Sequence, residues 1–484
     1  MESNLFDLID IDLDQTTERV LAGGRGLFPL LPRAFRGVEQ IGVIGWGPQA
    51  RAQAMNLRDS LAATPIRVTV GLRAGSSSYD GARADGFSEA AGTLGDMMDV
   101  IRASDLVLLL IADAALVARH REIFGALKHD AIIGLSHGFL LAHLQSQGGC
   151  FPPDHSVIAV CPKGMGASVR RLYEQGMTTE GAGINCSVAV HADVDGRAGD
   201  VALGWAVGIG APFVFETTLE SEYVSDIAGE RAILLGIPHA IAEAMYRRRT
   251  EMGDAPTDAF IRSTECMTGA LARFISHGGL RAVLDEFAGD DRTTFDHAYC
   301  ASYRATAPLI EELYDEVRSG NEVSGVCLAA QRATPMPEID GSRMWRVGAT
   351  VRAARDGHDV AIDPTTAGVF CGAMMAQVDV FRREGHPWSE IANESIIELV
   401  DSLIPFMHAR GVAYMVDNCS TTARLGARKW GPRFEAALNQ QAFPRLDGEG
   451  AREDALIAAL EAHPIHDVLD AIGKFRPAVD IAVS

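Results

Sequence analysis

Two pairs of acidic residues have the spacing that places both carboxylates on one face of a helix. Asp226 and Glu230 are four residues apart, and so are Glu394 and Glu398. Side chains at this spacing lie about 5–6 Å apart, so the two like charges repel and a cation beside them relieves the cost. Mg²⁺ prefers such oxygen ligands and keeps several waters that a substrate can displace. The two pairs therefore indicate a Mg²⁺ site.

A solvated helix face is the alternative interpretation of each pair. The second pair, however, is surrounded by the apolar residues Ile396, Ile397, Leu399 and Val400. A buried carboxylate needs a partner or a metal, because burying its charge alone is costly. The apolar surroundings favour the metal site.

A glycine-rich loop follows the apolar run Gln40–Ile44 and precedes a helical stretch over 51–59. The loop reads Gly45-Trp46-Gly47-Pro48-Gln49-Ala50. This is G-x-G-x-x-A between a strand and a helix, the setting in which a pyrophosphate binds at a helix N-terminus. Gly45 allows the tight turn, and Gly47 lets the pyrophosphate approach the backbone. The loop predicts a dinucleotide-binding domain; a simple turn is the alternative.

The end of the second strand indicates which dinucleotide binds. An enzyme that uses NAD usually has an acidic residue there, which bonds the ribose 2′-hydroxyl. Here Arg73 follows the strand, and Ser76, Ser77 and Ser78 come soon after. Because a guanidinium binds phosphate bidentately, these residues predict a pocket for the 2′-phosphate of NADPH. A solvated turn is again the alternative.

The elements that position these residues change in type near residue 218. Before it, short β-branched runs alternate with helical stretches, which is typical of a parallel sheet covered by helices. After it, apolar residues recur at helical spacing. We expect an α/β domain over 1–218 and an all-α domain over 219–484. The expected strands are Gln40–Ile44, Arg67–Leu72, Leu106–Ala112, Ala131–Leu135, Val157–Cys161, Ser187–His191 and Pro212–Phe215.

The helical part contains two stretches, 219–284 and 368–408, that can be aligned with each other. The alignment sets Glu265 against Glu398 and Phe274 against Phe406. A duplication and a chance likeness both remain open. The tract Arg332–Asp363 is rich in Pro, Gly and charge and is predicted to be a connecting segment.

Composition and net charge exclude some kinds of binding partner and indicate the compartment of the protein. The chain has 484 residues and a net charge of −21, which argues against nucleic acid or an anionic membrane as a partner. Eight cysteines without a CxxC pair are typical of unbridged thiols in a reducing compartment. Acids at the N-terminus argue against a signal or transit peptide. We expect a cytoplasmic homo-oligomer, with a dimer favoured; a plastid location is the alternative if a transit peptide was removed.

Several stretches resemble the ketol-acid reductoisomerase family in its long, plant-like class II form. The resemblance covers nearly the whole chain and is carried by Gly134-Leu-Ser-His137-Gly138, Cys161-Pro-Lys163-Gly-Met-Gly166, Ser225-Asp226-Ile-Ala-Gly-Glu230-Arg231 and Val416-Asp417-Asn418-Cys419-Ser420-Thr-Thr422. It implies a Rossmann-like NADPH-binding domain followed by an all-α C-terminal domain that is duplicated and knotted.

The resemblance also implies roles for the acidic residues and for one serine. Asp226 bridges two Mg²⁺ ions, and Glu230 binds one of them. Glu394 and Glu398 act on metal and substrate, directly or through waters, and Ser420 bonds the substrate. Either Glu230 or Glu398 relays protons.

In the nucleotide domain, the resemblance implies roles for His137 and Lys163. Both follow strands and line the cleft that faces the metals, where His137 also contacts the cofactor. Pro48 departs from the family, which usually has Ser there. Proline lacks the N–H and hydroxyl that could bond a pyrophosphate, although it is well tolerated at the first position of a helix. We expect weakened or rearranged cofactor binding.

The implied reaction is a Mg²⁺-dependent alkyl migration followed by reduction with NADPH. The substrate is 2-acetolactate or 2-aceto-2-hydroxybutyrate, the product is a 2,3-dihydroxy acid, and the pathway is the synthesis of valine, isoleucine and leucine. Two alternatives are a metal-free hydroxy-acid dehydrogenase and a non-catalytic NADPH-binding sensor. A Mg²⁺ requirement would exclude the first, and the complete acidic set counts against the second.

Overall fold

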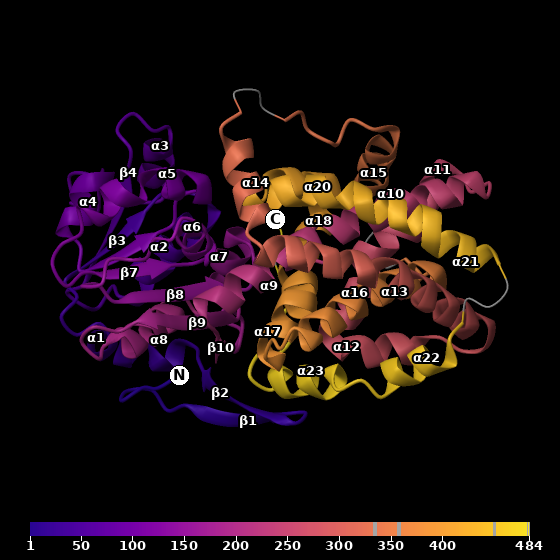
Figure 1. Cartoon of the computed structure of the whole chain (residues 1–484), viewed down its shortest axis with the longest axis horizontal. Coiled ribbons are helices and arrows are strands. Elements are labelled where there is room, and N and C mark those ends of the chain that lie inside the picture. The colour runs from indigo at the N-terminus through magenta and orange to yellow at the C-terminus, as the bar shows by residue number, and fades with distance from the viewer. Residues whose placement is uncertain (333–335, 356–359, 449–451, 482, 484) are drawn as a thin grey trace. The chain divides into compact units, whose positions relative to one another are not determined.

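A computed structural model describes residues 1–332, 336–355, 360–448, 452–481 and 483 (Figure 1). The chain forms two compact units. The first comprises Met1–Tyr223 with Ala471–Val479, and the second comprises Val224–Asp470 with Asp480–Ser484. None of the helices in the described ranges is both long and apolar enough to cross a membrane.

A single sheet organises the first unit. In spatial order its strands are β1 (Ile9–Leu13), β2 (Thr16–Ala22), β10 (Phe213–Glu216), β9 (Cys186–Ala192), β8 (Val157–Pro162), β7 (Ile132–Leu135), β6 (Leu106–Leu109), β3 (Gln40–Ile44), β4 (Arg67–Leu72) and β5 (Leu94–Asp96). The run from β8 to β5 is parallel, whereas the pairs β8–β9, β2–β10 and β1–β2 are antiparallel.

The predicted parallel pairing therefore holds for the run from β8 to β5 and for the pair β9–β10, but not for the whole sheet. All seven expected strands exist, two with the expected bounds and five with bounds shifted by one to three residues, but β1, β2 and β5 were not anticipated. The missed strand β1 alternates isoleucine with aspartate at the edge of the sheet and is mostly exposed. Charged residues are common on such edges because they discourage pairing with other chains. The resulting pattern lacks the continuous apolar run by which buried strands are recognised.

Helices cover both faces of this sheet. In order they are η1 (Arg25–Leu30), α1 (Leu31–Ala34), α2 (Pro48–Ser60), α3 (Ser78–Ala84), α4 (Met97–Ala103), α5 (Asp113–Phe124), α6 (Phe139–Ser146), α7 (Gly166–Gln175) and α8 (Ala198–Gly208). Successive residues of β6 enter opposite cores: Leu106 and Leu108 belong to a cluster that includes Trp205, and Val107 and Leu109 to one that includes Leu140. This is the two-residue period of a strand that is buried on both faces.

Every regular element in the described residues of the second unit is a helix. Its elements are α9 (Leu219–Arg231), α10 (Gly236–Glu251), α11 (Pro256–Phe260), η2 (Ile261–Glu265), η3 (Met267–Leu271), α12 (Ala272–Glu286), α13 (Gly289–Arg318), α14 (Asn321–Ala330), α15 (Arg343–Ala353), α16 (Pro364–Arg383), α17 (Trp388–Ala392), η4 (Asn393–Ile397), η5 (Leu399–Leu403), α18 (Ile404–Arg410), α19 (Val412–Asn418), α20 (Thr421–Ala437), η6 (Leu438–Ala442), α21 (Phe443–Asp447), α22 (Asp454–Glu461) and α23 (Ile465–Gly473). The division between the units falls within α9 and within α23.

The long helices α13 and α16 pack closely against each other (Figure 1). A Cβ on Gly368 or Gly372 would overlap the carbonyl oxygen of Phe295 or Tyr299, so glycine one turn apart on α16 lets the two backbones approach. Ser302 Oγ donates to Val369 O at 2.7 Å across the same contact. The pair therefore forms a rigid centre for the helical unit.

The tract Arg332–Asp363 is more than a connecting segment, which corrects that prediction. It contains α15, whose buried residues Met344, Trp345, Gly348 and Val351 recur at helical spacing. Charge and glycine around these positions hid the pattern. Two parts of the tract, 333–335 and 356–359, lie outside the described residues.

The same order of elements occurs twice in the helical unit. A long helix, a short helix, two π-helical turns and a further helix run from α10 to α12 and again from α16 to α18. Arg262 is the second residue of η2 and Glu394 the second of η4, while Cys266 and Glu398 follow these turns directly. The element register therefore sets Cys266, and not Glu265, against Glu398.

Helix α2 begins in contact with the start of α7. A Cβ on Gly166 would overlap the carbonyl of Pro48, and no described atom lies within 4 Å of a Cβ built on Gly47. We expect Gly166→Ala to destabilise the protein by about 1–3 kcal/mol, because the two helix ends must move apart. Gly47→Ala is the matched control and should cost less than about 1 kcal/mol. Urea denaturation measures both values, and equal losses would contradict the steric explanation.

Candidate active site

The glycine-rich loop lies between β3 and α2, as expected. Gly45 has φ +113°, and a Cβ there would come within 2.7 Å of Leu110 O, so only glycine fits. Gly47 is the extended residue directly before α2, and its exposed side faces open space within the described structure. The first turn of α2 can therefore receive an anion on its N–H groups.

Three further residues of the loop have structural roles. Pro48 is the first residue of α2, where its missing N–H costs no helical hydrogen bond. Gln49 Nε2 donates to Gly164 O at 2.7 Å, which links the loop to the segment after β8. Trp46 packs edge-on against Phe87, with ring centroids 5.4 Å apart. Trp46 thus anchors the loop to the unit's own core.

The predicted phosphate-binding residues lie on the turn between β4 and α3 and at the first residue of α3. Arg73 is exposed, and Ser76 N donates back to Arg73 O at 3.1 Å. Ser78 N donates to Ser76 Oγ at 3.3 Å. The turn therefore presents a guanidinium and two hydroxyls within one short stretch.

His137 and Lys163 follow neighbouring parallel strands, β7 and β8. A chain of polar contacts holds these strand ends: Gln53 Nε2 donates to Ser136 Oγ at 2.9 Å, and Ser136 Oγ donates to Val160 O at 2.7 Å. His137 Nδ1 accepts from the backbone N–H of Phe139 at 2.9 Å. A neutral His137 ring therefore carries its proton on Nε2.

Glu222 is the ion-pair partner of Lys163. Its Oε1 lies 3.6 Å from Lys163 Nζ, and both side chains are 1 % exposed. Its Oε2 accepts from Gly138 N at 2.7 Å, so one carboxylate joins the segments after β7 and β8. Glu222 was not among the predicted site residues. The available signal was its spacing of four residues from Asp226, which extends the series to three acids.

The two acidic pairs lie on helices that pack against each other. Glu394 is fully buried, Glu398 nearly so, and Asp226 and Glu230 are half-buried. A Cβ on Gly229 of α9 would lie 3.2 Å from Glu394 O. Gln377 links the same segments, since its Oε1 accepts from Ile233 N at 3.1 Å and its Nε2 donates to Glu394 O at 3.0 Å.

One carboxylate from each acidic pair raises the pKa of the same thiol, that of Cys419. Burial raises the pKa of Cys419, and the charges of Glu230 and Glu398 raise it further. Both carboxylates are therefore close to Cys419, the residue before Ser420. Ser420 caps α20, where its Oγ accepts from Ala423 N at 3.0 Å. Because that bond uses a lone pair of the hydroxyl, the hydroxyl proton can be donated to a substrate.

The chemistry of these residues fits a hard divalent cation. All four predicted ligands supply carboxylate oxygens, and two of them are buried, where a neighbouring cation offsets the cost of their charge. In the described part of the chain, no three side chains of His, Cys, Asp or Glu are already gathered as a ligand set. Mg²⁺ keeps several waters and is commonly bound by one or two carboxylates, so it does not need such a cage.

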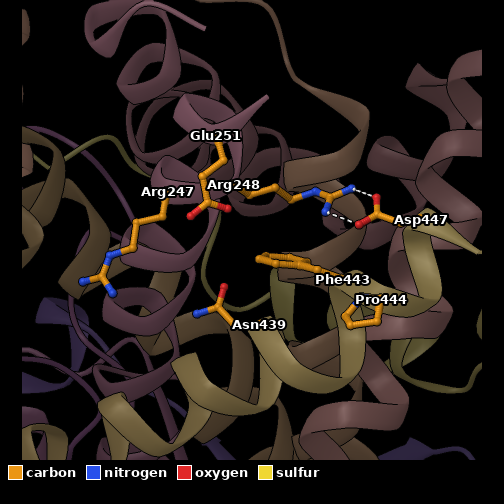
Figure 2. Close-up of a pocket in the computed structure, with 7 residues that line it drawn as sticks. All are labelled: Arg247, Arg248, Glu251, Asn439, Phe443, Pro444 and Asp447. Atoms are coloured by element: carbon orange, nitrogen blue, oxygen red, sulfur yellow. Dashed lines mark hydrogen bonds and ion pairs between the residues drawn. The ribbon is translucent and has the colours of Figure 1, made fainter. Parts of the chain in front are cut away.

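A polar hollow of about 380 Å³ lies elsewhere in the helical unit and holds none of the predicted residues. It is lined by Arg247, Arg248, Glu251, Asn439, Phe443, Pro444 and Asp447 (Figure 2). Arg248 donates both terminal nitrogens to Asp447, at 2.6 and 3.0 Å, and its guanidinium lies over the Phe443 ring. Arg247 is bonded to Glu243 and Glu435. Both arginines that line this hollow are already paired with carboxylates, so the hollow is a poor site for an anion.

Comparisons with known proteins bear on both units. Residues 37–213 match the model for the acetohydroxy acid isomeroreductase NADPH-binding domain, and residues 219–356 match the ketol-acid reductoisomerase C-terminal domain. The chain is 52% identical to the chloroplastic ketol-acid reductoisomerase of Spinacia oleracea, over all of this chain and 83% of that protein. Identity is also 52% to the chloroplastic enzyme of Pisum sativum, over all of this chain and 85% of that protein.

A more distant relative and a solved structure that resemble this chain are also ketol-acid reductoisomerases. The mitochondrial ketol-acid reductoisomerase of Saccharomyces cerevisiae is 32% identical over 65% of this chain and 78% of that protein. The structure of an NADH-preferring ketol-acid reductoisomerase from an uncultured archean has a TM-score of 0.58 and 23% identity, covering 66% of this chain and 95% of that one. This last likeness supports the fold alone.

Full-length identity of this degree and the match of both domains establish the enzyme class, including the NADPH-binding unit. The chain, with its NADPH-binding domain, belongs to the ketol-acid reductoisomerase family, enzymes of branched-chain amino-acid synthesis that isomerise and reduce small acetohydroxy acids.

Proposed function

We propose that Asp226, Glu230, Glu394 and Glu398 hold two Mg²⁺ ions on which the acetohydroxy acid is bound. The observation that carries this proposal is the packing of Gly229, on the helix with Asp226 and Glu230, against the backbone carbonyl of the buried Glu394. The direction in which Glu230 and Glu398 shift the pKa of Cys419 agrees with this packing. When bound, Mg²⁺ polarises the hydroxyl and ketone oxygens of the substrate, and NADPH supplies the hydride.

The chain's own residues divide the remaining work. Ser420 donates its hydroxyl proton to the carboxylate or ketone of the substrate. Glu230 or Glu398 accepts the hydroxyl proton of the substrate, and loss of that proton drives the alkyl shift. Glu398 is the more buried of these two carboxylates. The substrate is 2-acetolactate or 2-aceto-2-hydroxybutyrate.

We also propose that Lys163 and His137 serve the reduction step from the nucleotide unit. Glu222 holds the Lys163 ammonium in place and keeps its buried charge paired. His137, when neutral, carries its proton on Nε2 because Nδ1 accepts from Phe139. Both groups can hold or move a proton through water when the new hydroxyl forms.

The cofactor proposal rests on the two turns of the nucleotide unit. The pyrophosphate of NADPH lies along Gly45–Gln49 at the start of α2, and Arg73 with Ser76 and Ser78 binds the 2′-phosphate. Pro48 leaves this loop with one N–H fewer than a serine would offer. The turn after β4 therefore contributes a larger share of the binding energy.

The central test is NADPH oxidation with 2-acetolactate, with and without Mg²⁺. We expect turnover to require Mg²⁺, and Glu398→Gln to reduce it at least about 100-fold, as expected for loss of a proton-transfer group. NADPH binding, followed by fluorescence, should be unchanged. Glu390→Gln is the matched control, because this buried glutamate one turn before Glu394 is bonded to His386. Near-normal turnover by Glu398→Gln would refute the assignment.

Cofactor selectivity tests the phosphate pocket. Arg73→Gln should weaken NADPH binding about 10–100-fold, since a charge-assisted bond contributes about 1.5–3 kcal/mol, and should leave NADH binding unchanged. Arg102→Gln, which removes an exposed arginine paired with Asp99 on α4, is the control. The ratio of the two dissociation constants is the measurement. Equal weakening of both cofactors would show that Arg73 does not bind the 2′-phosphate.

The Lys163–Glu222 pair gives a prediction on stability. Glu222→Gln should cost about 3–5 kcal/mol of unfolding free energy, because it removes a buried charge that is paired with the buried Lys163 ammonium. Glu220→Gln, on the exposed side of the same helix, should leave stability within about 0.5 kcal/mol of the parent. Urea denaturation compares them; a loss below about 1 kcal/mol for Glu222→Gln would argue that the pair is not important.

A further inference from the structure

Arg231 directly follows the proposed metal ligand Glu230 and is completely buried. Its Nε donates to Glu322 Oε2 at 2.6 Å, and its Nη1 donates to Ile227 O at 3.2 Å. The same Nη1 lies 3.8 Å from Glu230 Oε2. Its Nη2 has no acceptor among the described residues. One guanidinium thus lies between two carboxylates and has donor capacity left over.

Glu322 holds this guanidinium from the first turn of α14. It is 3 % exposed and also accepts from Trp430 Nε1 at 2.9 Å and from Lys429 Nζ. Burial acts to raise the pKa of Glu322, but the charge of Arg231 and the three donors outweigh burial and lower it. Glu322 is therefore ionised at neutral pH.

Helix α20 completes the arrangement. A Cβ on Gly426 would lie 2.6 Å from both Cγ and Cζ of Arg231, so the arginine side chain crosses α20 at a glycine. The same helix carries Ser420 at its start and the two donors to Glu322 further along. Glu322 thereby connects α9, with its proposed metal ligands, to the helix that presents Ser420.

We propose that Glu322 is a positioning residue that holds the Arg231 guanidinium beyond hydrogen-bonding distance of Glu230, with Nη1 3.8 Å from Oε2, so that Glu230 can bind Mg²⁺. This inference rests on the proposed role of Glu230 as a metal ligand. Arginine and carboxylate form strong, often bidentate pairs, and such a pair would compete with the metal for the oxygens of Glu230. Arg231 binds Glu322 in preference to Glu230, because the carboxylate of Glu322 is closer to the guanidinium and accepts from two further donors.

The test compares Mg²⁺ dissociation constants from calorimetry, together with thermal denaturation, for the parent and its variants. Glu322→Gln removes the charge that holds Arg231, so we expect Mg²⁺ to bind about 10–100-fold more weakly, the usual effect of losing a residue that orients a metal ligand. Arg231→Gln removes the competitor and should bind Mg²⁺ within about threefold of the parent. In the Arg231→Gln background, adding Glu322→Gln should have no further effect.

The matched control is Asp363→Asn, which removes the charge of a carboxylate without changing the length of the side chain. Asp363 is a second buried carboxylate of the helical unit that is bonded to a buried arginine, Arg249. This variant should lose thermal stability and keep its Mg²⁺ affinity. Glu322→Asp keeps the charge but shortens the reach, and should weaken Mg²⁺ binding by less than Glu322→Gln. Glu322→Asp therefore still tests the proposal if Glu322→Gln fails to fold.

The outcomes separate this inference from the metal site itself. Unchanged Mg²⁺ affinity in both Glu322 variants, or an equal loss in the presence and absence of Arg231, would overturn the positioning role. If Glu230→Gln leaves Mg²⁺ binding unchanged, the proposed metal site fails and the inference fails with it. Weaker Mg²⁺ binding by Glu230→Gln, together with the expected results for the Glu322 and Arg231 single and double variants, supports both the metal site and the positioning role of Glu322.

Discussion

Buried negative charge is the constraint on which the rest of this structure depends. Glu222, Glu322, Glu394 and Glu398 are all largely removed from water, in a chain whose net charge is −21. Each such carboxylate must be paired, because the cost of burying a lone charge exceeds what packing returns. Glu222 is paired with Lys163 and Glu322 with Arg231. In our proposal Mg²⁺ does the same for Glu394 and Glu398.

The backbone around these charges is arranged to make the contacts short. Gly229 lets α9 reach the carbonyl of Glu394, Gly426 lets Arg231 cross α20, and Gly166 lets α7 meet Pro48. At each place a Cβ would push the elements apart, and the packing of the interior leaves little room to absorb this. Glycine here serves close approach, whereas at Gly45 it also serves a positive φ.

The two similar halves of the helical unit do not carry the same chemistry. Where η4 has Glu394 and is followed by Glu398, η2 has Arg262 and is followed by Cys266. Arg262 pairs with Asp363, which also pairs with Arg249. The first half thus uses an ion pair where the second half has two carboxylates. We propose that the halves arose by duplication and that the acidic pair was kept in one of them.

The local patterns of the sequence by themselves determined the dinucleotide loop, the central strands and the spacing of the acids, because turns and periodicity depend on neighbouring residues. The motifs around His137, Lys163 and Ser420 also determined the family. Only the tertiary structure decided the partner of each charge. Glu322, for example, is 91 residues from Arg231, and nothing in its neighbourhood indicates that it is bonded there. Edge strand β1 and helix α15 were likewise missed, because exposed charge masks a weak apolar pattern that only packing makes decisive.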